Sequence, residues 1–210
     1  NLGLVIIDEQ HRFGVDQRRM LKDKRNDGLA VHQLVMTAPP IPRTLAMTFL
    51  ADLDYSVIDE LPPGRKPITT VALSNERRDD VIERVKLACQ EGRQVYWVCT
   101  LVDESEVLAA EAAETTAALL AEQLKGISVG LVHGRLKPDD KKAAMQAFKQ
   151  GAVNVLVATT VIEVGVDVPN ASLMVIENAE RLGLAQLHQL RGRVGRGSVE
   201  SHCVLLYQKP

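Results

Sequence analysis

Two carboxylates directly follow an apolar run at the start of the chain, and their types suit phosphate chemistry. The run covers residues 2–7 and leads into Asp8 and Glu9. Ligands of parallel α/β sheets bind at the carboxyl ends of strands, where an Asp can hold Mg²⁺ through its hard oxygens. A neighbouring Glu can orient or deprotonate a water that attacks a γ-phosphate. The alternative is that the two acids merely end a strand in solvent.

Arginines interleaved with glycines near the other end of the sequence are the second chemical feature. Residues 189–197, here called the arginine segment, read Gln-Leu-Arg-Gly-Arg-Val-Gly-Arg-Gly. Arg193 and Arg196 are three positions apart, so we expect them on one face of a helix. Guanidinium forks at this spacing can clamp a phosphate chain, and glycines let the backbone approach it. The alternative is a solvated or DNA-binding basic face.

The elements that must position these residues alternate between strands and helices. This alternation predicts an α/β fold with a parallel sheet covered by helices on both faces. The predicted strands are residues 2–7, 33–37, 94–99, 129–132, 153–157, 173–176 and 203–206. The predicted helices are residues 43–51, 77–91, 104–125 and 139–149. Asp103 and Glu106 are placed as a capping box for the third helix, and Pro138 begins the fourth.

Two features refine this arrangement. The continuous apolar run at residues 2–7 predicts a strand that is buried on both faces. Prolines at positions 62, 63 and 67, with Gly64 between them, predict a linker. We therefore place a domain boundary near residues 60–68.

Composition narrows the function classes. The net charge is -2, so contacts with nucleic acid would have to come from local patches. Three cysteines, spaced far apart, exclude a disulfide framework and suit a reducing cytosol. Three Phe, three Tyr and one Trp are too few for a base-stacking platform. No run approaches the roughly 18 apolar residues of a membrane span, so we expect no membrane partner.

The string Asp-Glu-Gln-His-Arg-Phe-Gly-Val at residues 8–15 resembles the nucleotide-hydrolysing motif of superfamily 2 helicases, and in particular of the RecG family. The resemblance implies that Asp8 serves Mg²⁺ and that Glu9 activates water. It also implies that Gln10 and His11 couple the γ-phosphate to movement. ATP and Mg²⁺ are the implied cofactors.

The arginine segment is similar to motif VI of the same helicases, Gln-x-x-Gly-Arg-x-x-Arg. In that motif the arginines reach from a second motor lobe to ATP bound by the first. The resemblance assigns Gln189 to nucleotide binding and Arg193 and Arg196 to catalysis, with Arg196 as the arginine finger. Residues 183–188 also fit the RecG family and its relative, the transcription-repair coupling factor.

Residues 158–169 resemble helicase motif V. This resemblance makes Thr159 and Thr160 implied contacts to the DNA backbone, and Gly165 and Asp167 implied residues on the ATP side. The alternative is a turn with ordinary hydroxyls.

His133 and Arg135 follow a predicted strand and resemble a DNA-facing element of the second lobe. The alternative for His133 is a structural histidine in the core.

Residues 36–43 stand where motif III belongs, so the resemblance assigns Thr37, Ala38 and Arg43 to coupling. The family usually has Thr-Ala-Thr-Pro-Ile-Pro-Arg at this place. Here Pro39 replaces the second Thr, which removes a hydroxyl and a backbone N–H and restricts the preceding residue to extended conformations. The departure puts the coupling between ATP and DNA in question.

One expected feature is absent from the sequence. No Gly-x-x-x-x-Gly-Lys-Ser/Thr occurs, and no glycine precedes a lysine. We therefore expect the phosphate-cradling loop to lie upstream, and the isolated chain to lack ATPase activity. The chain opens on Asn1 and enters a strand at once, which indicates a fragment. Residues 1–60 would be the C-terminal part of a first RecA-like lobe, and residues 61–210 a second RecA-like lobe.

The resemblance implies a fragment of an ATP-dependent double-strand DNA translocase that remodels stalled forks and Holliday junctions in repair and recombination. The implied partners are branched double-stranded DNA, an N-terminal lobe and wedge domain of the same protein, and single-strand DNA-binding protein. The implied location is the bacterial cytoplasm, at the nucleoid. Two alternatives stay open, a transcription-repair coupling translocase and a non-enzymatic module that binds DNA or protein.

Overall fold

The computed structural model divides the chain into two units, Asn1–Ile58 and Asp59–Pro210, which are described separately. The residues described are 3–8, 31–36, 54, 56–61, 63–100, 105–159, 168–197 and 199–209. The helix predicted at residues 43–51 lies outside them.

The first unit contains two parallel strands, β1 (Leu4–Ile7) and β2 (His32–Val35). Their register runs from Leu4 opposite His32 to Ile7 opposite Val35. Both strands were predicted, within two residues at each end. Because the pair is parallel, the residues that follow the two strands lie at the same edge of the sheet.

Burial in β1 alternates instead of covering both faces. Val5 and Ile7 are buried, whereas Leu4 and Ile6 are 54% and 59% exposed. The prediction of a strand buried on both faces is therefore wrong for this structure. The physical reason is the period-2 alternation of side chains, which places Leu4 and Ile6 together on a face that nothing covers here.

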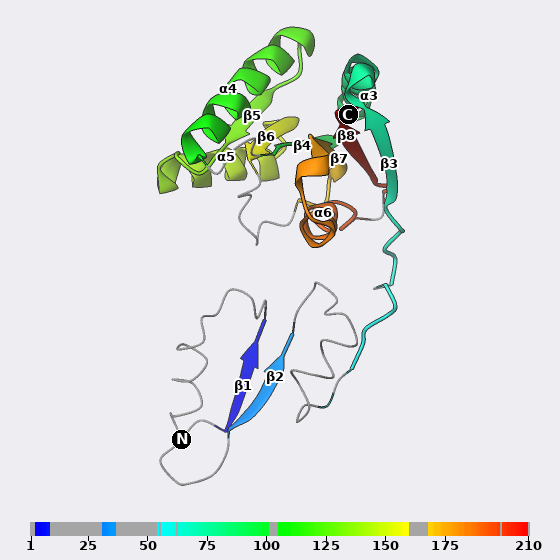
Figure 1. Cartoon of the computed structure of the whole chain (residues 1–210), viewed down its shortest axis with the longest axis vertical. Helices are drawn as coiled ribbons and strands as arrows, with labels where there is room; N and C mark the ends of the chain where they lie inside the picture. The colour runs from blue at the N-terminus through cyan, green and yellow to red at the C-terminus, as the bar shows by residue number, and fades with distance from the viewer. Residues whose placement is uncertain are drawn as a thin grey trace. The chain divides into compact units, whose positions relative to one another are not determined.

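The second unit contains the remaining elements, labelled in Figure 1. In chain order they are β3 (Thr69–Ser74), the 3₁₀ turn η2 (Asn75–Arg77), α3 (Arg78–Gln90), β4 (Gln94–Cys99), α4 (Glu106–Gln123), β5 (Val129–Val132), α5 (Pro138–Lys149), β6 (Val155–Thr159), β7 (Ala171–Glu177), the 3₁₀ turn η3 (Ala179–Arg181), α6 (Leu184–Arg191) and β8 (His202–Tyr207).

These strands form a six-stranded sheet in the described part of the unit, in the order β3-β8-β7-β4-β6-β5. Every pairing within it is parallel. The fold-class prediction, a RecA-like parallel α/β sheet flanked by helices, is confirmed. All the carboxyl ends consequently meet at one edge, where ligands of such sheets bind.

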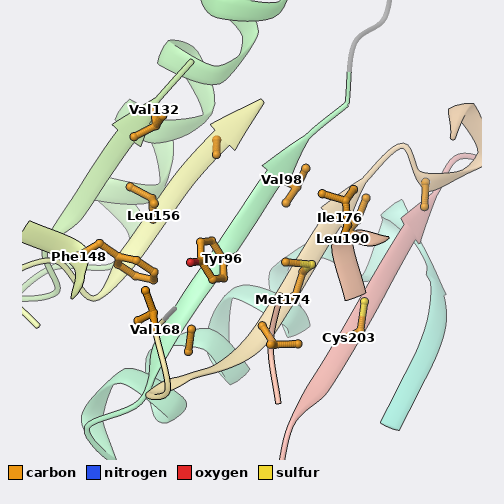
Figure 2. Packing of buried hydrophobic residues seen from close by; sticks show 14 residues of the cluster. Tyr96, Val98, Val132, Phe148, Leu156, Val168, Met174, Ile176, Leu190 and Cys203 are labelled. Carbon is orange, nitrogen blue, oxygen red and sulfur yellow. The ribbon is translucent and has the colours of Figure 1, made fainter. Parts of the chain in front are cut away.

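Helices cover both faces of the sheet because its central strands are apolar on both sides. Every residue of β4 is buried, and the side chains alternate between two cores. Trp97 packs in the core beneath α3 and α4, whereas Tyr96 packs in the core beneath α5 and α6. Figure 2 shows the second core, with Tyr96 facing Phe148 of α5 across β6. Their ring centroids are 4.9 Å apart in an edge-to-face arrangement.

Three sequence expectations about elements need correction. Strand β3 was not predicted, because its exposed residues give no clear alternation. Helix α4 begins at Glu106 with Ser105 as its N-cap and no side-chain cap bond, so the predicted capping box is wrong. Strand β6 runs two residues later than predicted, which places Thr159 inside the strand and not after it.

Candidate functional site

Asp8 and Met36 lie next to each other at the carboxyl edge of the β1–β2 pair. Asp8 is exposed and directly follows β1. The Met36 N–H, directly after β2, donates to the Ile7 carbonyl at 2.8 Å. The structure therefore brings together the starts of the two sequence regions assigned to hydrolysis and coupling. The other residues predicted there lie outside the described residues; they are Glu9, Gln10, His11, Thr37, Ala38, Pro39 and Arg43.

Three neighbouring strand ends form the centre of the second unit's carboxyl edge. Cys99 of β4 lies opposite Thr159 of β6 on one side and opposite Glu177 of β7 on the other. Thr159 is only 3% exposed. Its assignment as a DNA contact stays a prediction. Thr160, Gly165 and Asp167 lie outside the described residues.

An ion pair that the sequence did not predict occupies this edge. The Arg78 Nε donates to Glu177 Oε1 at 2.7 Å, and both side chains are largely buried. The guanidinium also lies over the Trp97 ring, 5.2 Å from its centroid. Because 99 positions separate the two partners, no local pattern could have identified the pair.

The arginine segment begins in a helix but leaves it early. Gln189 lies in α6, which ends at Arg191 with Gly192 as its C-cap. Gly195 then adopts a positive φ of 75°, which continues no helix. The prediction that Arg193 and Arg196 share one helical face is therefore wrong. Arg193 is half-buried and Arg196 is exposed.

Close backbone contacts seat the segment against the rest of the unit. The Gly195 carbonyl accepts a hydrogen bond from Arg65 Nε at 3.0 Å. A Cβ at Gly197 would lie 2.7 Å from the Pro169 carbonyl oxygen. Val194 is fully buried in the core beneath α6. Since Pro169 ends the predicted motif V, the structure joins the end of that motif to the end of the arginine segment.

The turn after β5 is held by two side chains. His133 is 6% exposed, and its Nε2 lies 3.2 Å from Glu114 Oε1 on α4. Lys141 Nζ donates to the Gly134 carbonyl at 2.7 Å. Arg135 between them is exposed. The buried imidazole favours the structural alternative for His133, whereas the exposed guanidinium leaves a contact with DNA open to Arg135.

The three cysteines are buried and free. Burial raises the pKa of Cys99 to about 12, with the Glu177 charge as a second cause. Burial likewise raises the pKa of Cys89 and of Cys203 to about 11. All three thiols are therefore protonated core groups near neutral pH, as predicted. Among the described residues, no three His, Cys, Asp or Glu side chains gather as a metal cluster.

None of the helices that the structure describes is long and apolar enough to cross a membrane.

A family comparison matches residues 73–198, from β3 to the end of the arginine segment, to the helicase conserved C-terminal domain. The chain belongs to this helicase family. The match includes the Arg78–Glu177 pair, Thr159 and the arginine segment.

The most similar relatives include ATP-dependent DNA helicases called RecG. The protein of Escherichia coli strain K12 is 69% identical over 211 residues, which is all of this chain and 30% of the relative. The protein of Thermotoga maritima is 52% identical over 207 residues, which is 98% of this chain and 26% of the relative. The predicted similarity to RecG helicases is confirmed. This helicase chain spans less than a third of the length of these relatives.

Solved structures agree on the fold. A structure of RecG bound to a three-way DNA junction superposes with a TM-score of 0.78 and 46% identity, covering 100% of this chain and 26% of that one. The DUF1998 helicase MrfA bound to DNA gives a TM-score of 0.69 at 20% identity, covering 100% of this chain and 30% of that one, and supports the fold alone.

Proposed function

We propose that this chain is part of an ATP-dependent double-strand DNA translocase that remodels branched DNA, such as stalled forks and four-way junctions, in bacterial repair and recombination. The observation that carries the proposal is the contact of Gly197 with Pro169, which joins two helicase motifs at the edge of one parallel sheet. The 69% identity to RecG helicases supports the same assignment.

Residues 1–60 would belong to a first, ATP-binding motor lobe and residues 61–210 would form the second. The exposed apolar face of the first unit supports this assignment. Leu4 and Ile6 of β1 share that face with Leu34 and Met36, all of them more than two-fifths exposed. A sheet with such a face requires a further packed layer, which the remainder of a RecA-like lobe would supply.

ATP and Mg²⁺ would bind between the two lobes. Asp8 fits a Mg²⁺ ligand, because its carboxylate is exposed at the carboxyl edge of parallel strands. Bound Mg²⁺ neutralises charge on the β- and γ-phosphates. Arg193 and Arg196 would contact the phosphates from the second lobe as guanidinium forks. Glu9 would orient the attacking water, while Gln10, His11, Gly165, Asp167 and Gln189 would complete the nucleotide site.

DNA would bind along its phosphate backbone. The strand-end residues Thr159 and Thr160, and the turn with Arg135, would supply hydroxyl and guanidinium donors to phosphate oxygens. The described aromatic side chains Trp97, Tyr96 and Phe148 are buried in the two cores. Such an interface suits a motor that tracks a duplex without reading its bases. Thr37, Ala38 and Arg43 would couple the two sites.

The isolated chain would not hydrolyse ATP, because its 210 residues contain no phosphate-cradling Gly-x-x-x-x-Gly-Lys sequence. Its partners would be the first lobe and wedge domain of the same protein, branched DNA, and single-strand DNA-binding protein.

The test is ATP hydrolysis by the longer RecG-type protein that carries this chain, on three-way junctions and on linear duplexes of equal length. We expect junctions to stimulate turnover more. Glu9→Gln should abolish turnover and keep ATP binding. Equal stimulation by both DNAs would contradict remodelling of branched DNA, and retained hydrolysis in the variant would remove Glu9 as the water activator.

A further inference from the structure

Glu177 is the meeting point of three elements of the second unit. Its Oε1 accepts from Arg78 Nε at 2.7 Å, and its Oε2 lies 3.7 Å from the Cys99 sulfur, whose S–H donates. The side chains of Arg78 and Glu177 are only 22% and 14% exposed. The start of α3 and the end of β4 are therefore both tied to the last residue of β7.

The next residue continues the same junction. Asn178 adopts a left-handed conformation with φ 48° and ψ 46°. Its carbonyl accepts from the Thr100 hydroxyl at 3.3 Å, and its Oδ1 accepts from Gln208 Nε2 at 3.1 Å. A non-glycine residue in this region is strained unless its surroundings hold it there. Four side chains thus fix the direction in which the chain leaves β7.

That direction matters because the chain next enters η3 and α6, which carry the arginine segment. A largely buried ion pair adds little net stability, since desolvation of the two charges offsets their attraction. Its geometry, however, is well defined, because a guanidinium and a carboxylate meet at a fixed angle. A pair at this place therefore acts on geometry more than on stability.

We propose that Arg78 and Glu177 are positioning residues that set the course of the chain from β7 into the arginine segment. This inference rests on the proposed function, since its consequence is the placement of Arg193 and Arg196 against a nucleotide. Neither Arg78 nor Glu177 contacts the reacting groups. Misplacement of the segment lowers the rate of hydrolysis without removing any residue from it.

The test uses the longer protein with branched DNA, and compares Glu177→Ala, Glu177→Gln and Arg78→Lys. Glu177→Ala should lower kcat roughly 10- to 100-fold, because small displacements of a reacting group have effects of this size. The KM for ATP should change far less. Arg78→Lys keeps the charge but not the planar fork, so its kcat should fall between those of wild type and Glu177→Ala.

The matched control is Glu76→Ala. Glu76 pairs with Lys209 at the same 2.7 Å, two positions from Arg78, but the side chains are 69% and 58% exposed. Its loss should leave kcat within about twofold of wild type, since exposed pairs contribute little. A merely structural role of Glu177 would lower Tm and leave kcat unchanged at temperatures where the variant is folded. That result would overturn the inference, as would an equal loss in the Glu76 variant.

The 210-residue chain offers a second readout that needs no ATP. Trp97 is the single tryptophan, and its ring lies under the Arg78 guanidinium. Glu177→Gln should keep the far-UV circular dichroism and change the Trp97 emission, because the uncharged amide holds the guanidinium less firmly. Unchanged emission would contradict the geometry. Absence of turnover in the wild-type longer protein would instead refute the proposed function, so the two failures are distinguishable.

Discussion

A Cβ on Gly197 would stand 2.7 Å from the carbonyl oxygen of Pro169, a distance that real Cβ atoms do not reach. The two backbones can pack this closely only because position 197 has no side chain. The glycine therefore connects the end of the arginine segment to the residues just before β7. This contact lies entirely within the second unit, and the central account depends on it.

Gly197→Ala should separate the two segments. We expect the free energy of unfolding to fall by about 1–3 kcal/mol, because the added methyl group overpacks against backbone that cannot rotate away. Denaturant unfolding of the 210-residue chain, followed through Trp97 emission, measures the change. The control is Gly134→Ala, whose new Cβ would have its nearest neighbour at 4.0 Å. Equal losses in both variants would show that the Pro169 contact is not tight.

Arg196→Ala should reduce ATP turnover by the longer protein by roughly 10³-fold if Arg196 is an arginine finger. Loss of a charge that stabilises the transition state has an effect of this size. Arg84→Ala, which removes another exposed arginine of the second unit, on α3, serves as the control and should change turnover little. A loss below about tenfold for Arg196→Ala would return this residue to the basic-surface alternative.

Thr159→Val should lower DNA-stimulated ATPase activity more than basal activity. Thr159 is buried at the end of β6, and Val keeps its branched shape while removing the hydroxyl. Thr159→Ser, which keeps the hydroxyl, should retain most of the stimulation. Paired assays with and without DNA measure the ratio. The same fractional loss in both assays would argue against a DNA contact.

The buried thiols should make the chain less stable in alkali. Burial raises the pKa of Cys99 to about 12 and those of Cys89 and Cys203 to about 11, whereas an exposed thiol titrates near 9.0. Above pH 9 the unfolded chain releases these protons and the folded chain keeps them. The stabilisation is therefore complete below about pH 9 and is lost as pH rises toward 11 and 12.

Thiol labelling tests this sign directly. At pH 8 the folded chain should react slowly with a disulfide reagent at all three cysteines, and rapidly once it is unfolded in denaturant. A triple Cys→Ala variant should lose less stability than the wild type between pH 8 and pH 10.5. Fast labelling of the folded chain would contradict the burial of the thiols.

Phe148→Ala should destabilise the second unit by about 3–5 kcal/mol, since it leaves a cavity beside Tyr96 in the core shown in Figure 2. The residue is fully buried, and its carbonyl accepts a hydrogen bond from the Gln94 side chain. Leu184→Ala, at a leucine that is 86% exposed, should change stability by less than about 0.5 kcal/mol. Equal unfolding midpoints would contradict the core packing.

The central elements could be predicted from the sequence because their signals are local. The run at residues 94–99 is apolar throughout, and β4 has these bounds. Pro138 marked the start of α5 correctly. The edge strand β3 gave no such signal, because an edge strand with exposed side chains lacks the pattern of burial.

The site was less accessible to sequence reasoning because much of it depends on distant contacts. The spacing of Arg193 and Arg196 is compatible with a helix, but Gly192 ends α6 and Gly195 turns the chain with a positive φ. The Arg78–Glu177 pair joins residues 99 positions apart. Only the folded sheet, which sets β4 and β7 side by side, brings these two residues together.

The most direct measurement is ATP hydrolysis by the 210-residue chain and by the longer protein that carries it, each with and without branched DNA. The account predicts turnover, stimulated by DNA, in the longer protein alone, because the catalytic arginines and the phosphate-cradling loop would come from different parts of it. Hydrolysis by the 210-residue chain alone would contradict the account, since that chain would then contain a complete nucleotide site.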